Sequence, residues 1–170
     1  MLLDREGLPL YCALNSQDQW AFPIRLDEVS PHLITATIAA EDQRFYSHHG
    51  VDLLAFGRAF RQNLRHKGIR SGASTISMQV IKLADQSSGR SSLTQKFRQI
   101  IQAVRLELRV DKDRILAAYL NRAPYFRNVR GCEAASRRLF GKPCRELTLA
   151  QASLLAGLPK APSALDPLLH

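Results

Sequence analysis

A carboxylate lies on what is otherwise the apolar face of a predicted helix near the start of the chain. The segment SPHLITATIAAEDQRFYSHHG (30–50) places Ile34, Ile38 and Phe45 at helical spacing, and Glu41 falls on the same stripe. Desolvation in a partly apolar cleft favours the neutral form of a carboxyl group, as a general acid or base working near neutral pH requires. The alternative is a structural carboxylate paired with an arginine in the core.

Two polar residues of the same segment extend this candidate site. Asp42 directly follows Glu41, and His48 comes shortly before Gly50. We expect His48 to be a structural hydrogen-bonding residue, since the His-His pair lacks the spacing of a metal-binding motif.

A second cluster, SGASTISMQVIK (71–82), has the composition of an anion-binding helix start. Ser74 and Thr75 supply hydroxyl groups where the helix opens, and free backbone N–H groups at a helix start attract anions. Lys82 lies along the same helix, and Arg90 follows in the next loop. The alternative is an ordinary capped helix with solvated cations.

The predicted helix at about 92–110 carries a polar row beside its apolar face. Lys96, Gln99 and Glu107 form this row, which can face a cleft. For Glu107 we favour a buried pair with an arginine, and for Lys96 the alternative is a stem that covers apolar surface. The predicted apolar face consists of Leu93, Phe97, Ile100, Val104 and Leu108.

The whole pattern predicts a mainly α-helical protein with weak strand signals. An extended lead-in is expected at 1–30, and helices are expected at about 31–46, 53–67, 75–84, 92–110, 112–121, 132–140 and 149–157. Asp52, Asp111 and Thr148 are the predicted caps of three of these helices. The helix at 53–67 has Leu and Phe opposite Arg, which suits either packing on the core or a membrane interface.

Composition narrows the classes of partner. The 170 residues carry a net charge of +9, which fits nucleic acid, an anionic membrane surface or a phosphate-bearing substrate. No apolar stretch is long enough for a membrane span, and no signal peptide is evident. Cys12, Cys132 and Cys144 are odd in number and lack CxxC spacing, so buried free thiols are expected rather than a metal site or a disulfide framework.

Taken in order, five segments resemble the motifs of the peptidoglycan glycosyltransferase domain, glycosyltransferase family 51. They are EDQRFYSHHGVD (41–52), GASTISMQVIK (72–82), KFRQIIQAVRLE (96–107), RILAAYLN (114–121) and the segment 131–142, which ends in FGK. Met78 and NRAP at 121–124 resemble the penicillin-binding protein 1C branch of the family.

The resemblance implies a lysozyme-like, mainly α-helical fold with a small membrane-facing jaw at the helix 53–67. It implies polymerisation of lipid II into glycan strands, with release of undecaprenyl pyrophosphate. Glu41 would be the catalytic base that takes a proton from the 4-hydroxyl of the incoming GlcNAc. The implied substrate-binding residues are Asp42, His48, Ser74, Thr75, Gln79, Lys82, Arg90, Lys96, Arg98 and Gln99.

The resemblance also implies partners and a location. Lipid II, the growing glycan strand and the membrane surface would be partners, and nucleic acid would not. A transpeptidase domain or other cell-wall enzymes would be further partners, and the periplasmic face of the bacterial inner membrane would be the location. We expect residues 31–170 to form the glycosyltransferase domain, truncated at its C-terminus and with no transpeptidase motif in this sequence.

One departure from the family concerns a cofactor. The family's third motif normally carries a second glutamate where this chain has Gln99. A divalent cation, Mg or Mn, is the cofactor that the family implies, but glutamine cannot ionise, so metal dependence stays open.

Three other functions compete with glycosyl transfer. A lysozyme-like hydrolase would use Glu41 as an acid, but it has no need of Lys82 and Arg90. A nucleic-acid-binding protein would explain the charge, yet the basic residues are dispersed and no zinc or RNP-type motif occurs. A catalytically impaired fragment that binds lipid II or glycan is consistent with Gln99.

Overall fold

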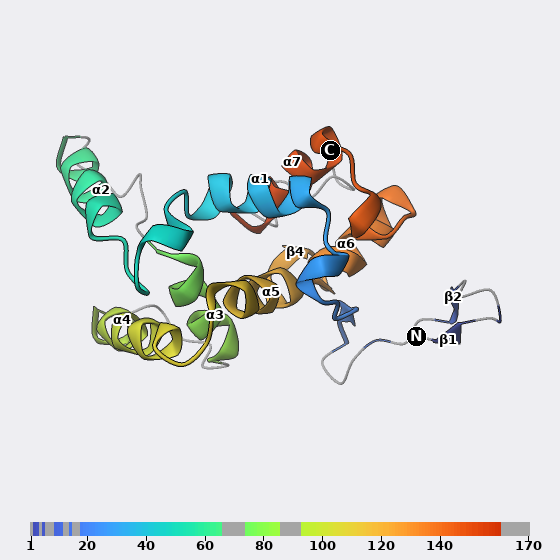
Figure 1. The fold of residues 1–170 in the computed structure, drawn as a ribbon, viewed down its shortest axis with the longest axis horizontal. Coiled ribbons are helices and arrows are strands. Elements are labelled where there is room, and N and C mark those ends of the chain that lie inside the picture. Colours follow the sequence, from blue (N-terminus) through green and yellow to red (C-terminus); the bar gives the residue numbers. More distant parts are fainter. Residues whose placement is uncertain are drawn as a thin grey trace. The chain divides into compact units, whose positions relative to one another are not determined.

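The computed structural model describes residues 2–3, 5, 9–11, 14, 18–65, 74–85 and 93–160. The prediction of a mainly α-helical fold is confirmed (Figure 1). The helices are α1 (Pro31–Glu41), α2 (Leu53–Arg65), α3 (Ile76–Ala84), α4 (Leu93–Glu107), α5 (Lys112–Arg122), α6 (Cys132–Phe140) and α7 (Leu149–Gly157). Short 3-10 helices are η1 (Leu26–Glu28), η2 (Phe45–Ser47), η3 (Cys144–Glu146) and η4 (Leu158–Lys160).

The chain divides into two compact units. Unit 1 comprises Met1–Thr37 and Leu120–His170, and unit 2 comprises Ile38–Tyr119. The sequence-based boundary at residue 30 is a different kind of division, between an extended lead-in and the helical part. The short strands β1 (Leu2–Leu3) and β2 (Pro9–Tyr11) pair with each other in that lead-in.

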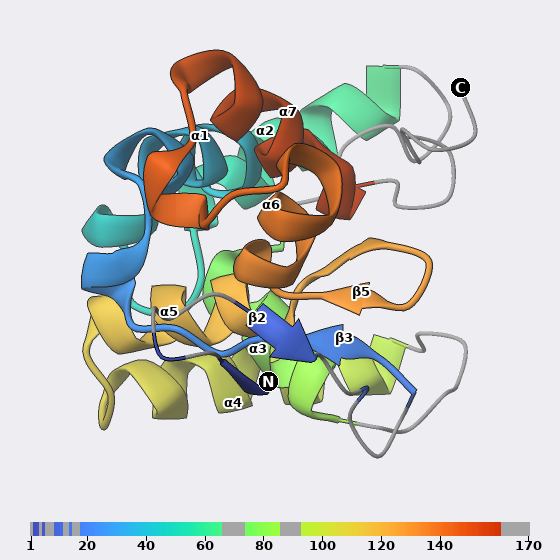
Figure 2. The same cartoon turned by 90° about the vertical axis from the view of Figure 1, so that its right-hand side faces the viewer.

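Unit 1 holds a small three-stranded sheet covered by a helix. The strand β5 (Val129–Arg130) pairs in parallel with β3 (Trp20–Ala21) and antiparallel with β4 (Pro124–Phe126). Helix α6 packs on these strands, and α7 packs on α6 (Figure 2). The core of unit 1 includes Tyr125, Phe126, Leu155 and Leu158, all with less than 2% of their surface exposed.

Unit 2 is organised around the packing of α3 on α4. Gly50 allows the loop before α2 to approach α4 closely, since it adopts a φ of +91° and a Cβ atom there would lie 2.7 Å from the backbone nitrogen of Val104. Thr75 fastens the same loop, because its hydroxyl donates a hydrogen bond of 2.6 Å to the Gly50 carbonyl. The start of α3 is therefore fixed against the loop that follows Glu41.

Several predicted caps are confirmed. Asp52 accepts a hydrogen bond from the backbone N–H of Ala55 at the start of α2, and Asp111 accepts one from Arg114 in α5. Thr148 forms a capping box with Gln151 at the start of α7. Such caps satisfy backbone donors that a helix start would otherwise leave unpaired.

Helix α1 begins where it was predicted to begin but ends earlier than predicted. It begins at Pro31 as expected, but the Ser30 hydroxyl donates to the carbonyl of Leu147, 3.2 Å away. The helix ends at Glu41 instead of continuing to residue 46, and the separate turn η2 places Phe45 in the core. Glu41 is therefore the last residue of its helix, where a side chain can face a cleft.

The predicted inner face of α4 is wrong in part, since Ile100 and Val104 are partly buried but Phe97 and Leu108 are exposed. Phe97 and Leu108 are exposed to 65% and 78%, whereas Ala103 is fully buried and Glu107 is nearly so. The polar row beside the apolar stripe thus packs inward. The small side chain of Ala103 permits the close approach of Gly50, and Glu107 is buried because it is ion-paired.

Helix α2 also turns its large apolar residues outward. Leu53, Leu54 and Phe56 are exposed to 78%, 61% and 48%, while Ala59 is buried. In the first two turns of α2, the Leu and Phe side chains therefore do not pack on the core. In the part of the chain that the structure describes, no helix is both long enough and apolar enough to cross a membrane.

Candidate functional site

The side chain of Glu41, at the end of α1, is hydrogen-bonded to Gln79 through one of its two carboxylate oxygens. The Gln79 side chain in α3 donates a hydrogen bond of 2.8 Å from Nε2 to Glu41 Oε2. The other oxygen, Oε1, is buried and has no hydrogen-bond partner among the described residues. Within the described residues, Glu41 does not form the alternative core pair with an arginine, because its partner is the neutral amide of Gln79.

Tyr119 is a polar residue near Glu41 that sequence reasoning missed. Its ring is buried, and its hydroxyl has no hydrogen-bond partner among the described residues. Burial, together with the negative charge of Glu41, raises the pKa of Tyr119 well above its usual range. Its position in the RILAAYLN segment gave no signal of this, since a tyrosine on a helix reads as an ordinary core residue.

Asp42 and His48 form a buried pair beside Glu41. His48 Nε2 lies 2.9 Å from Asp42 Oδ2, and both side chains are only 4% exposed. Asp42 Oδ2 also accepts a hydrogen bond of 3.0 Å from the backbone N–H of Ile76, the first residue of α3. His48 is thus hydrogen-bonded within the protein, as the sequence pattern predicted, and the pair ties the end of α1 to the start of α3.

An ion pair between Lys112 and Glu107 continues this buried network. Lys112 Nζ donates a hydrogen bond of 2.7 Å to Glu107 Oε1, and it lies 3.5 Å from His48 Nδ1. Ser77 donates to the same Glu107 oxygen. The prediction that Glu107 is a buried, paired carboxylate is confirmed, but its partner is Lys112 instead of an arginine. Lys112 was missed because it occupies an ordinary first position of a helix.

A pocket of about 160 Å³ adjoins the Glu41–Gln79 contact. Its lining residues are Ser74, Met78, Gln79, Lys82, Lys96 and Gln99. Lys96 Nζ donates a hydrogen bond of 2.6 Å to Ser74 Oγ. Burial, and secondarily the charge of Lys82, lowers the pKa of Lys96. Two ammonium groups and a hydroxyl therefore line the pocket, and Gln79 joins it to Glu41.

This arrangement can be compared with known proteins. The sequence profile described as "Transglycosylase" matches residues 10–170 of the chain. The chain belongs to the transglycosylase family. Penicillin-binding protein 1A of Neisseria flavescens is 43% identical over 86% of the chain and 18% of its own length. Penicillin-binding protein 1C of Escherichia coli is 36% identical over 98% of the chain and 21% of its own length.

The transglycosylase chain spans about a fifth of the length of these curated relatives. Penicillin-binding protein 1A of Pseudomonas aeruginosa shows the same relation, with 39% identity over 87% of this chain and 18% of its own. Both the 1A and the 1C types are thus similar to this sequence, the 1C protein over the longer stretch.

The lining of the pocket does not suit a divalent cation. The pocket's ionisable side chains, Lys82 and Lys96, are ammonium groups, which repel a cation and cannot ligate it while protonated. Gln99 adds an amide but no charge. In the described part of the transglycosylase chain, no three His, Cys, Asp or Glu side chains are placed to share an ion. The donor set is that of an anion site, and dependence on Mg or Mn remains a prediction of the resemblance.

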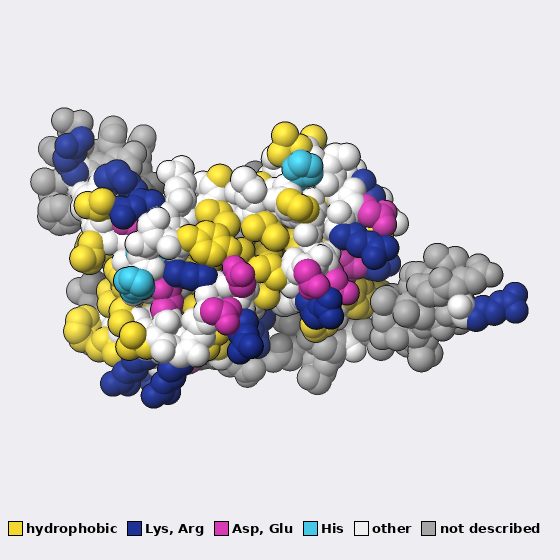
Figure 3. Space-filling model, in the orientation of Figure 1, with side chains coloured by type: hydrophobic (Ala, Val, Ile, Leu, Met, Phe, Trp, Pro, Cys, Tyr) yellow, Lys and Arg dark blue, Asp and Glu magenta, His cyan; other side chains and the backbone are white. Residues whose placement is uncertain are grey.

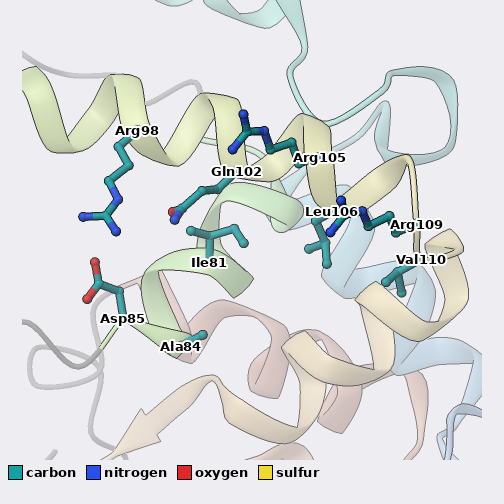
Figure 4. A pocket seen from close by; sticks show the side chains of 9 residues that line it. All are labelled: Ile81, Ala84, Asp85, Arg98, Gln102, Arg105, Leu106, Arg109 and Val110. Carbon is teal, nitrogen blue, oxygen red and sulfur yellow. The ribbon is translucent and has the colours of Figure 1, made fainter.

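The structure does not bring every predicted site residue to this pocket. Arg98 projects from α4 into a separate groove of about 450 Å³, where it reaches toward Asp85 at the end of α3 (Figure 4). Arg105 and Arg109 line the same groove, with Ile81 and Leu106 on its apolar side. Arg90 lies outside the described residues. Ser74, Gln79, Lys82, Lys96 and Gln99 line the pocket, and Glu41 adjoins it through Gln79. Asp42 and His48 form the buried pair, and Thr75 is bonded to the Gly50 carbonyl and to the N–H of Met78 instead of lining the pocket.

Proposed function

We propose that this transglycosylase domain polymerises lipid II into glycan strands, with release of undecaprenyl pyrophosphate. The observation that carries the proposal is the state of Glu41. One oxygen of its carboxylate is fixed by Gln79, and the other has no partner among the described residues. Such a carboxylate is oriented by the protein and keeps an oxygen for a substrate hydroxyl.

In the proposed reaction, Glu41 Oε1 accepts the proton of the 4-hydroxyl of the acceptor GlcNAc. The hydroxyl oxygen then attacks C1 of the lipid-linked MurNAc. The bond between C1 and the pyrophosphate oxygen breaks, and the leaving group departs with the bonding electron pair. The net result is a new glycosidic bond, a protonated Glu41 carboxyl and an undecaprenyl pyrophosphate anion.

The pocket beside Glu41 supports the second half of this reaction. Lys82 and Lys96 place two positive charges where Ser74 and Gln99 supply hydrogen-bonding groups. Cations aimed at a leaving pyrophosphate stabilise the charge that develops on it. Hydrolysis of a glycosidic bond leaves a neutral sugar hydroxyl and needs no such cations, so the pocket favours transfer over a lysozyme-like reaction. By resemblance, Arg90 would share this role.

The buried pairs support the geometry of the base. Asp42 receives hydrogen bonds from His48 and from the N–H of Ile76, so the residue after Glu41 is fixed to the helix that carries Gln79. We propose that Asp42 and His48 act in this way in addition to any contact with substrate. Thr75 contributes by fixing the first turn of α3.

Helix α2 supports contact with a membrane surface. Its exposed Leu53, Leu54 and Phe56 are joined by the exposed Arg58 and Arg61. Figure 3 shows hydrophobic side chains close to Lys and Arg side chains over the α2 and α4 part of unit 2. Apolar side chains next to arginines fit the boundary between acyl chains and anionic headgroups. This supports a location at the membrane that carries lipid II, with other cell-wall enzymes as partners.

The deciding experiment is polymerisation of lipid II in detergent, read as glycan strands on a gel. We expect the native chain to produce strands and Glu41→Gln to lose them, since the amide cannot accept the proton. Glu146→Gln is the matched control, because it makes the same change at an exposed carboxylate in η3. Strands from both variants would refute the assignment of the base.

Gln99→Glu separates a working domain from an impaired one. If only this variant makes strands, the native chain is an impaired member of its family. If native chain and variant are both silent while folded, lipid II binding is the remaining function. Release of reducing-end fragments from purified glycan would instead support hydrolysis.

A further inference from the structure

Two of the three cysteines meet inside unit 1. Cys132 is the first residue of α6, and Cys144 is the first residue of η3. Their sulfur atoms lie 3.9 Å apart, and both residues are 0% exposed. The prediction of buried free thiols is confirmed for Cys132 and Cys144, and the fold also places these two thiols in direct contact. Cys12 lies outside the described residues.

We propose that Cys132 and Cys144 are a cross-linking site that forms an intramolecular disulfide when the chain folds in an oxidising compartment. The two sulfurs, 3.9 Å apart, need to approach by about 1.9 Å to reach the length of a disulfide bond. Cysteine pairs persist as disulfides outside the cytosol and stay reduced within it. The proposed location of the domain at the outer side of a membrane supplies the oxidising setting.

The cross-link would fasten segments that are already joined by hydrogen bonds. The backbone N–H of Cys144 donates to Glu133 Oε2 in α6, at 2.8 Å, and the Cys144 carbonyl accepts from the N–H of Ser30. A disulfide would therefore make covalent an attachment of η3 to α6 that also holds the residue before α1. Glu133 is itself fixed by Arg137, so the acceptor is rigid.

The chemistry is thiol–disulfide exchange with an external disulfide, such as oxidised glutathione. A cysteine thiolate attacks one glutathione sulfur, and the first glutathione leaves as a thiol. The second cysteine then attacks the mixed disulfide, and the second glutathione leaves. Two protein thiols and one oxidised glutathione become one protein disulfide and two reduced glutathiones, so protons and electrons balance.

Burial of the two thiols determines whether oxidation comes before or after unit 1 folds. Contact with Cys132, burial and the nearby Glu133 all raise the pKa of Cys144, which leaves little of the nucleophilic thiolate in the folded state. Exchange is therefore expected while unit 1 is still open, and the folded reduced chain should resist oxidation. Once formed, the disulfide should resist reduction, because burial keeps an external thiolate from reaching its sulfur atoms.

The test uses the full chain with Cys12→Ser, so that only the pair can react. The protein is refolded from urea with oxidised and reduced glutathione, denatured, and treated with a maleimide-linked polymer that adds a visible mass to each free thiol. We expect both thiols to be lost together, with a peptide pair joined through positions 132 and 144 in mass spectrometry. Two free thiols, or glutathione attached to single cysteines, would overturn the proposal.

Stability provides a second readout. The cysteines are 12 positions apart, and closing a loop of about that size raises the melting temperature of a domain of this size by roughly 5–10 °C. The matched variant Cys12→Ser with Cys132→Ala retains Cys144 alone, and its melting temperature should not respond to oxidant. A cross-link that formed without raising the melting temperature would show that the native fold does not accommodate it, which would also overturn the proposal.

Discussion

Replacement of Gln79 by methionine tests whether the orientation of Glu41 limits turnover. Methionine has nearly the length and volume of glutamine but cannot donate the hydrogen bond of 2.8 Å to Glu41 Oε2. The carboxylate would then have no described partner on either oxygen, since Oε1 already has none. Rotation of the side chain would follow, and a base that rotates reaches the acceptor hydroxyl in fewer encounters.

The size of the effect follows from the strength of this contact. A hydrogen bond to a charged group contributes about 1.5–3 kcal/mol. At about 1.36 kcal/mol for each factor of ten, loss of the whole contribution in the transition state lowers kcat roughly 10- to 100-fold. Folding should change little, because the side chain is only half buried.

The assay is steady-state polymerisation of lipid II, with kcat and KM obtained separately. Gln102→Met is the matched control, because it makes the same change in the separate α4 groove. A raised KM with unchanged kcat would show that Gln79 contacts the substrate instead of orienting the base. Native values of both constants would refute the reasoning altogether.

Three further changes have defined outcomes. Glu107→Gln should lower the free energy of unfolding in urea by about 2–4 kcal/mol, because Lys112 loses its buried ion-pair partner. Gly50→Ala should cost roughly 3 kcal/mol or more in the same measurement, since φ is +91° and the added Cβ would collide with α4 backbone. Burial lowers the pKa of Lys96 in the folded chain, so at a pH between the lowered value and 10.5 the folded state has lost a proton that the unfolded state keeps. Unfolding then takes up a proton, and the free energy of unfolding rises as the pH increases through the lowered value. Calorimetry in buffers of different ionisation enthalpy should show proton uptake when pyrophosphate binds there, and Lys96→Met should abolish that uptake.

Most helix starts were predictable because local rules determine them, although α1 ends earlier than predicted. Proline at the start of α1, Asp52 and Asp111 before their helices, and Gly141 after α6 act within one turn of the chain. These interactions need no knowledge of the fold. The sequence placed hydroxyl groups at Ser74 and Thr75 where α3 opens, and the structure selects Thr75 as the cap.

The inward face of α4 was not predictable from its own sequence. Hydrophobic periodicity favoured Phe97 and Leu108, but the helix packs through Ala103 and Glu107. Its inward face depends on Gly50, far away in the chain, which brings backbone against backbone where no large side chain fits. Lys112 makes burial of a carboxylate there tolerable, and that pairing is also invisible to periodicity.

The candidate site was predictable in part. Glu41 was found because a carboxylate interrupted an apolar stripe. The lysines of the pocket were found because Lys82 lies on a helix with a hydroxyl-rich start and Lys96 lies in a polar row beside an apolar face. The burial of Tyr119 near Glu41 and the contact of Cys132 with Cys144 carry no local signal, since each depends on residues that come together only in the fold.

Gln99 gives the pocket a charge balance that a glutamate would change. Among the described residues, the lining side chains include Lys82 and Lys96 and no carboxylate, so these side chains present positive charge to an incoming pyrophosphate. A carboxylate at this position would raise the pKa of Lys96 and neutralise part of that charge before the leaving group forms. Gln99→Glu should therefore bind inorganic pyrophosphate about three- to tenfold more weakly without metal, from the loss of about 0.7–1.4 kcal/mol of attraction. Tighter binding of pyrophosphate by the variant, in a chelating buffer of fixed ionic strength, would show that the lysines do not act as the anion site.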